Sequence, residues 1–160
     1  FRRRSVKTVF SRKERTMYGV WILTIVDAFT RESPLIGVGF TYKGHDVVQA
    51  LEEAAHHAGY PRTLRIDNGP EFIGKDVDLG AYAHGVSLDF SRPGKPTDNA
   101  YIESFNSRFR QECLNQHWFL SLEDAKHKIE AWWQVYNSHR PHSSLGYLTP
   151  KEFADRHKSP

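Results

Sequence analysis

The stretch that most constrains the fold runs from Thr63 to Pro70. A short run of strand-forming character, Thr63–Ile66, ends in Asp67, and an Asn-Gly-Pro turn signal follows at once. This order predicts a strand with a carboxylate at its carboxyl end, where open α/β sheets bind their ligands. Taken alone, Asp-Asn-Gly also fits an ordinary turn. A functional site at this position therefore needs a second group that the fold brings to the same edge.

Hydrophobic periodicity divides the rest of the chain into strands and helices. The first three predicted strands have short connections and should form an antiparallel meander. The connection from the fourth strand through a helix to the fifth should be parallel and right-handed. The expected elements are strands at Ser5–Phe10, Gly19–Thr30, Leu35–Tyr42, Thr63–Ile66 and Val86–Phe90, and helices at Val47–Ala58, Asp76–His84, Ala100–Leu114 and from Ser121 onward. The predicted fold class is α/β, a mixed five-stranded sheet with helices on both faces.

The same patterns predict finer features of these elements. A polar turn is expected at residues 12–16. The first helix should bury a stripe of Val48, Leu51, Ala55 and Ala58, and Gly59 and Pro61 should end it. In the helix from Ala100, the rings of Tyr101, Phe105 and Phe109 recur every four residues and are expected in the core. Ser121 and Asp124 resemble a capping box at the start of the last long helix.

Size and composition are those of one soluble domain. The chain has 160 residues, of which 39% are hydrophobic and 26% are charged. Its longest apolar run is far shorter than a membrane span, and the start of the chain lacks the pattern of a secretory signal. Cys113 is the only cysteine, so no disulfide forms within the chain. These features predict a cytoplasmic protein without a membrane partner.

Positive charge gathers at the start of the chain. Residues 1–16 hold seven Lys or Arg residues and one acid, Glu14, whereas the whole chain has a net charge of +3. A basic arm on a nearly neutral body suits a polyanion, because each neutralised phosphate releases a counterion. The arm equally fits a solubilising terminus.

Glu103 is the candidate partner of Asp67, and 35 residues lie between them. It falls in the first turns of the predicted helix Ala100–Leu114. A strand-end carboxylate and a helix carboxylate brought together by folding can hold divalent metal for phosphoryl transfer. Acids near helix starts also favour the helix dipole, so each residue by itself remains ambiguous.

The sequence around these two acids is similar to the catalytic core of bacterial insertion-sequence transposases, which belong to the DDE group related to retroviral integrases. The similarity covers about residues 19 to 156. It rests on three segments, namely residues 65–72 (Arg-Ile-Asp-Asn-Gly-Pro-Glu-Phe), residues 90–106, and a tail with Tyr136-Asn137, Arg140-Pro141-His142 and Thr149-Pro150. The resemblance implies a ribonuclease H-like domain that cuts and joins DNA with Mg²⁺ or Mn²⁺, with Asp67 and Glu103 as catalytic metal ligands.

The family has a further acid on its first strand, and this chain departs from that pattern. In the alignment that matches Ser5 and Val6 to the family, Lys7 stands where the first Asp is expected. An ammonium group cannot ligate a cation, and beside two carboxylates it would repel one. We do not expect Asp27, at the end of the second predicted strand, to replace the missing acid. The fold should survive this change and catalysis should not.

Two functions of different classes follow from these observations. One is a transposase core that cleaves and transfers DNA strands, and the other is an inactive remnant that binds DNA or a partner. A ribonuclease H-type nuclease has the same fold but does not account for the tail.

Expected DNA partners are the insertion-element ends and target DNA, bound by a homo-oligomer. The expected domains are the core, 1–140, and a C-terminal tail with a short helix, 141–160. Candidate DNA-binding residues are Asn68, Arg92, Lys95, Asn99, Asn106 and Arg110.

Overall fold

A mixed five-stranded sheet forms the centre of the computed structural model, which describes residues 8–16, 19–66, 74–90 and 100–158. The strand order is β3-β2-β1-β4-β5. Strands β1, β2 and β3 are antiparallel, whereas β1, β4 and β5 run parallel. The predicted α/β architecture, with a meander followed by a parallel crossover, is confirmed. The strands are β1 (Thr8–Arg15), β2 (Trp21–Asp27), β3 (Leu35–Gly39), β4 (Thr63–Ile66) and β5 (Ser87–Phe90).

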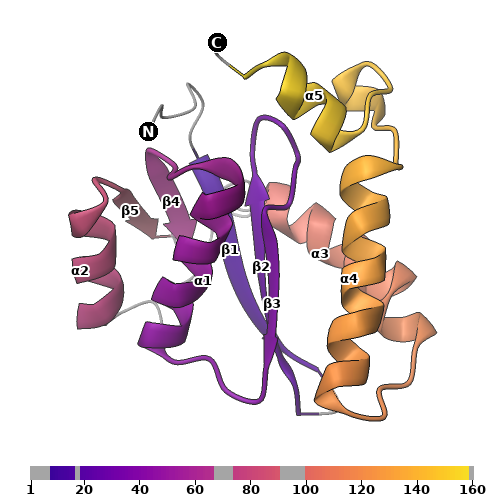
Figure 1. Ribbon diagram of the computed structural model, residues 1–160, viewed down its shortest axis with the longest axis horizontal. Helices are drawn as coiled ribbons and strands as arrows, with labels where there is room; N and C mark the ends of the chain where they lie inside the picture. Colours follow the sequence, from indigo (N-terminus) through magenta and orange to yellow (C-terminus); the bar gives the residue numbers. More distant parts are fainter. Residues whose placement is uncertain (1–7, 17–18, 67–73, 91–99, 159–160) are drawn as a thin grey trace.

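Helices cover both faces of the sheet, as Figure 1 shows. On one face, α1 and α2 pack against Leu23 and Ile25 of β2 and Leu64 of β4. On the other face, α3 and α4 enclose a second core with Ile22 and Val26 of β2. Because neighbouring strand residues alternate between faces, β2 supplies both cores and is buried along nearly its whole length. The helices are α1 (Gly44–Ala58), α2 (Lys75–Ala83), α3 (Ala100–Glu112), α4 (Leu122–Ser138) and α5 (Pro150–Arg156).

The first strand differs from the prediction, which placed it at residues 5–10 and a polar turn at residues 12–16. Strand β1 extends to Arg15, and its last residues pair with the start of β2, from Arg12 opposite Thr24 to Arg15 opposite Trp21. The charged residues at this end of β1 have low strand propensity. Pairing with the fully buried β2 outweighs that preference, because sheet propensity depends strongly on tertiary context.

Two further boundaries differ for reasons of packing. Strand β3 ends at Gly39 rather than Tyr42, because the Tyr42 ring folds back over the strand and a Cβ at Gly37 would lie 1.9 Å from its hydroxyl. In α1 the predicted stripe of Val48, Leu51, Ala55 and Ala58 is shifted by about one residue. The fully buried residues are Val47, Ala50, Ala54 and Ala55. Val48 and Leu51 instead are partly buried at the edge of the core.

The two C-terminal helices begin at caps that the sequence encodes. Ser121 Oγ accepts a hydrogen bond from Asp124 N, which confirms the predicted cap of α4. Thr149 and Glu152 form a reciprocal capping box at α5, the short helix expected in the tail. Across the residues that the structure describes, no helix is long and apolar enough to cross a membrane.

Candidate functional site

The helix of Glu103 is well described, whereas its proposed partner is not. Glu103 lies in the first turn of α3 and is exposed. The predicted core role of the helix's aromatic stripe is confirmed for Phe105 and Phe109, which are 3% and 2% exposed. This packing turns Glu103 away from the core and toward solvent. The predicted site residues Lys7, Asp67, Asn68, Arg92, Lys95 and Asn99 lie outside the described residues.

Asn106 does not lie on a DNA-accessible surface, and this corrects its predicted role. The side chain is only 3% exposed. Its Oδ1 accepts a hydrogen bond of 2.8 Å from Thr24 Oγ1 of β2, while its buried Nδ2 has no partner among the described residues. Asn106 therefore joins α3 to the sheet one turn after Glu103 and helps to fix the position of that turn. Arg110, another candidate DNA contact on α3, is half-buried.

The register between β1 and β4 bears on the predicted replacement of the first acid by Lys7. The parallel pairs run from Thr8 beside Thr63 to Ser11 beside Ile66. Lys7 precedes the first of these pairs in sequence, whereas Asp67 follows the last. The residue that continues the register on β1 is Arg12, whose partner on β2 is Thr24, the residue bonded to Asn106. The register of the described residues therefore does not support the expectation that Lys7 lies beside Asp67.

Carboxylates are scarce where a metal site would need them. Glu14 is the only acid of β1, and it pairs with Ile22 toward the hairpin end of the strand. Among the described residues, no group of three or more His, Cys, Asp or Glu side chains is placed to hold a metal ion. The acid at the end of β2, Asp27, is engaged elsewhere, since its Oδ1 accepts hydrogen bonds from Phe29 N and Thr30 N. Asp27 therefore stabilises the turn that follows β2.

The C-terminal end of α3 is anchored to α4 and to the segment that directly follows α4. Glu112 forms a bidentate pair with Arg140 and also accepts a 3.0 Å hydrogen bond from Trp132 Nε1. Hydrogen bonding from Arg140 is the main cause that lowers the pKa of Glu112 below its usual value. The sequence analysis missed this network, because its members lie up to 28 residues apart and only the family resemblance drew notice to Arg140.

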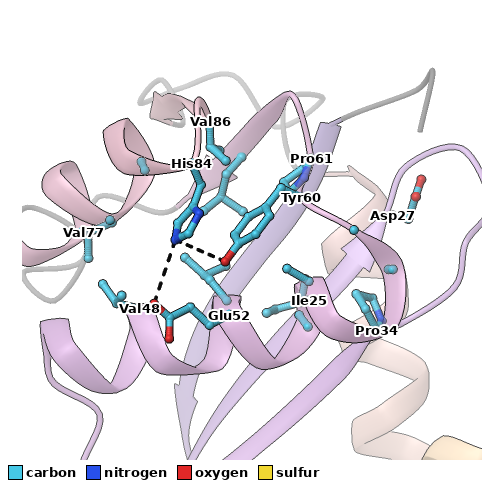
Figure 2. A pocket seen from close by; sticks show the side chains of 18 of the residues that line it. Ile25, Asp27, Pro34, Val48, Glu52, Tyr60, Pro61, Val77, His84 and Val86 are labelled. Atoms are coloured by element: carbon cyan, nitrogen blue, oxygen red, sulfur yellow. Dashed lines mark hydrogen bonds and ion pairs between the residues drawn. The ribbon is translucent and has the colours of Figure 1, made fainter. Parts of the chain in front are cut away.

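A second cluster of polar groups lies between α1 and α2, and Figure 2 shows it. Tyr60 and His84 stack with ring centroids 4.1 Å apart, and Tyr60 Oη lies 3.2 Å from His84 Nε2. His84 also lies 4.0 Å from a carboxylate oxygen of Glu52. The apolar cavity beside these residues has a volume of only about 50 Å³. The cluster links the two helices, and its small cavity does not offer room for the DNA that the sequence analysis expects as a partner.

Comparisons with known proteins agree with this fold. Two integrase core domain family models match the chain, one over residues 8–96 and the other over residues 84–150. A solved structure with a closely similar fold is the catalytic core domain of BIV integrase, with a TM-score of 0.77, 14% identity and 95% of each chain covered. The simian T-cell lymphotropic virus intasome has a TM-score of 0.81 at 15% identity, covering 99% of this chain and 57% of that one.

Relatives in sequence come from bacterial insertion elements. An IS407 protein of 31.7 kDa from Burkholderia multivorans is 53% identical over 137 residues, which are 86% of this chain and 50% of that protein. An IS476 protein of 39.2 kDa from Xanthomonas euvesicatoria is 49% identical, covering 86% of this chain and 40% of that protein. The IS904 transposase of Lactococcus lactis is 27% identical, covering 91% and 58%. This chain thus spans about half the length of these relatives. The chain belongs to the integrase core domain family, as the catalytic core domain of an insertion-sequence transposase.

Proposed function

We propose that the chain derives from an enzyme that cuts and joins DNA strands, with Asp67 and Glu103 as its remaining metal-binding carboxylates. The observation that carries this proposal is the exposed Glu103 in the first turn of α3. The helix α3 packs on the sheet, and strand β4 of that sheet leads directly into Asp67. Carboxylate oxygens are the ligands that Mg²⁺ and Mn²⁺ prefer. When bound, such ions would stabilise charge on the attacking and leaving oxygens of a phosphodiester.

The donor set does not fit a two-metal site built on three acids. The described part of β1 holds three basic residues, Arg12, Lys13 and Arg15, and its single acid is Glu14.

 Two carboxylates can hold one hard cation, but they do not supply the bridging ligand of a metal pair. The donor set of this chain therefore does not support a catalytic step that needs a metal pair.

A cation in place of the first acid favours the second candidate function, a core that binds DNA without cutting it. Ser11 pairs with Ile66, the residue before Asp67, and Arg12 directly follows Ser11 on β1. Arg12 itself pairs with Thr24 of β2. The register therefore favours Arg12 as the β1 residue at the level of the site. Lys7 remains the candidate that the family alignment suggests. In either case a positive charge would compete with metal for the same carboxylates.

The residues of the chain can still position DNA. Asn106 and Thr24 hold the first turns of α3 against the sheet, so that Glu103 stays on a fixed surface. Charged and amide side chains around it would contact phosphates and orient the strand. We propose this role for Asn68, Arg92, Lys95, Asn99 and Arg110, in a homo-oligomer that binds insertion-element ends and target DNA in the cytoplasm. Residues 1–140 would form the core, with residues 141–160 as its tail.

Titration of Mn²⁺ by isothermal calorimetry tests which position has lost its acid. The variants are Arg12→Asp and Lys7→Asp, with Lys13→Asp as a control that makes the same charge change one residue away. We expect Arg12→Asp to bind Mn²⁺ more tightly than the unmutated chain and to recover some nicking of element-end DNA.

The other outcomes separate the hypotheses. Tighter binding by Lys7→Asp alone would restore the family alignment and refute the register argument. Equal gains in all three variants would indicate a general charge effect, because a nonspecific field does not depend on position. Tight two-site binding by the unmutated chain would show that another acid completes the site. It would refute the hypothesis that the chain lacks a metal-binding acid.

A further inference from the structure

A polar pocket opens beside the Glu103 turn, at the junction of four segments. It has a volume of about 240 Å³ and lies between α3, the end of α4, the turn after β2 and the tail. Its apolar wall consists of Val26, Phe105 and Tyr136. Its polar lining consists of Arg31, Ser104, Arg108, His142 and Ser144. Ser104 directly follows Glu103 on α3, so the pocket adjoins the proposed catalytic surface.

The lining of the pocket is basic. Two arginines, Arg31 and Arg108, line it, and no carboxylate is among its described lining residues. Arg108 is exposed, and the described part of the chain offers it no recorded hydrogen bond or ion pair. The nearby acid Glu112 is already paired with Arg140. The pocket is therefore suited to an anion.

His142 is held rigidly and has an unsatisfied atom. Its backbone N donates to Leu148 O at 3.0 Å, and its backbone O accepts from Tyr147 N at 2.8 Å. The ring packs edge-on against Tyr136, with centroids 5.2 Å apart. Its buried Nε2 has no hydrogen-bond partner among the described residues. Buried polar atoms are almost always paired, so the unpaired Nε2 of a residue that lines a pocket is a candidate partner for a ligand bound there.

Arg31 adopts a backbone conformation that a side chain such as arginine rarely takes. Its φ angle is 62°, in the left-handed region that favours glycine or asparagine. Three hydrogen bonds hold it there, from Arg31 N to Asp27 O, from Arg31 Nη1 to Ala28 O and from Tyr136 Oη to Arg31 O. Strain of this kind persists at functional sites when the surroundings enforce it.

We propose that this pocket binds a backbone phosphate of the DNA next to the Glu103 surface, an inference that rests on the proposed DNA-binding function. Guanidinium groups recognise phosphate oxygens through charge-assisted hydrogen bonds. Serine hydroxyls and an imidazole N–H add neutral donors of the kind that commonly contact DNA phosphates. The pocket would fix the position of one strand relative to α3 without reading its sequence. This also gives a role to the Arg-Pro-His segment of the tail, which contains His142.

DNA binding by the Arg108→Gln variant is the first test. Fluorescence anisotropy with a labelled duplex, at several salt concentrations, gives the slope of log affinity against log salt. We expect Arg108→Gln to bind several-fold more weakly and to reduce the slope by about one, because one phosphate contact is lost. Arg62→Gln is the matched control, since Arg62 is an exposed arginine just before β4. It should leave the slope unchanged.

The ¹⁵N resonances of the His142 ring provide a second readout, which reports on this pocket. DNA bound to arginines elsewhere on the surface would not change them. We expect the ¹⁵N resonances of this ring to shift on addition of duplex, and the shift to be lost in Arg108→Gln. A parallel titration with inorganic phosphate separates the anion alone from the DNA backbone. Unchanged His142 resonances with DNA would overturn the proposal, whatever the slope, and so would a response to inorganic phosphate only. Failure of the unmutated chain to bind DNA at all would instead refute the proposed function, and the phosphate site with it.

Discussion

His142 should make the stability of the protein depend on pH in a predictable direction. Burial of the ring, followed by the charges of Arg108, Arg140 and Arg31, lowers the pKa of His142 from 6.5 to about 4. The folded protein therefore keeps the ring neutral at pH values where the unfolded chain takes up a proton. Since the unfolded state binds more protons between these two values, the free energy of unfolding must fall as the pH falls through that range.

The size of the effect follows from the difference between the two pKa values. One pKa unit corresponds to about 1.4 kcal/mol, so the shift corresponds to about 3 kcal/mol once the pH is below 4. At about pH 5 the folded ring is still largely neutral, and the loss is about 2 kcal/mol relative to neutral pH. This loss is a large fraction of the stability of a typical domain.

Urea denaturation at about pH 7.5 and about pH 5 measures this effect when His142→Asn is compared with the unmutated protein. The variant removes the ring that resists protonation, so we expect it to lose about 2 kcal/mol less on acidification. Other titrating groups contribute to both proteins and cancel in the difference. His117→Asn, at an exposed histidine, is the control and should behave like the unmutated protein. An equal loss in the His142→Asn variant would refute the assignment of a neutral, depressed-pKa ring.

Three other perturbations test the packing and the charge distribution. Glu112→Gln should lower the free energy of unfolding by about 1–2 kcal/mol in thermal or urea denaturation, because it breaks a charge-assisted pair, whereas the exposed Glu130→Gln should not. Asn137→Ala should cost about 2 kcal/mol by the same measurements, since it leaves a fully buried backbone N–H without its acceptor, and Gln134→Ala on the exposed side of α4 is its control. Deletion of residues 1–4 should flatten the salt dependence of DNA affinity, and an unchanged slope would exclude contact between the arm and phosphates.

Element order could be read from the sequence because the signals are local. The apolar runs of the strands, the stops at Gly59 and Pro61 and the cap at Ser121 each depend on a few neighbouring residues. The alternation of strands and helices then restricts the sheet to a meander followed by a parallel crossover. The aromatic stripe of α3 and the cap of α4 were predicted correctly for the same reason.

The differences arose where one element depends on another. Arg12 and its neighbours extend β1 because β2 lies beside them, and their own composition gave no sign of this. The buried stripe of α1 shifted because the exact face turned toward the sheet depends on how the helix is docked. Asn106 has the spacing of a surface residue beside Glu103, yet Thr24, 82 residues away, draws it into the core. Packing between distant segments leaves no local pattern in the sequence.

The sequence by itself determined the fold class and the family, and it predicted Asp67 and Glu103 as the two carboxylates of the candidate site. It also predicted that Lys7 stands where the family has its first acid. Only the tertiary structure decided which β1 residue continues the register toward β4, and only it brought Arg31, Arg108 and His142 to one pocket. The physical reason is that periodicity, caps and turn signals act over a few residues. Strand register and the convergence of side chains instead depend on contacts between segments that fold together from far apart in the chain.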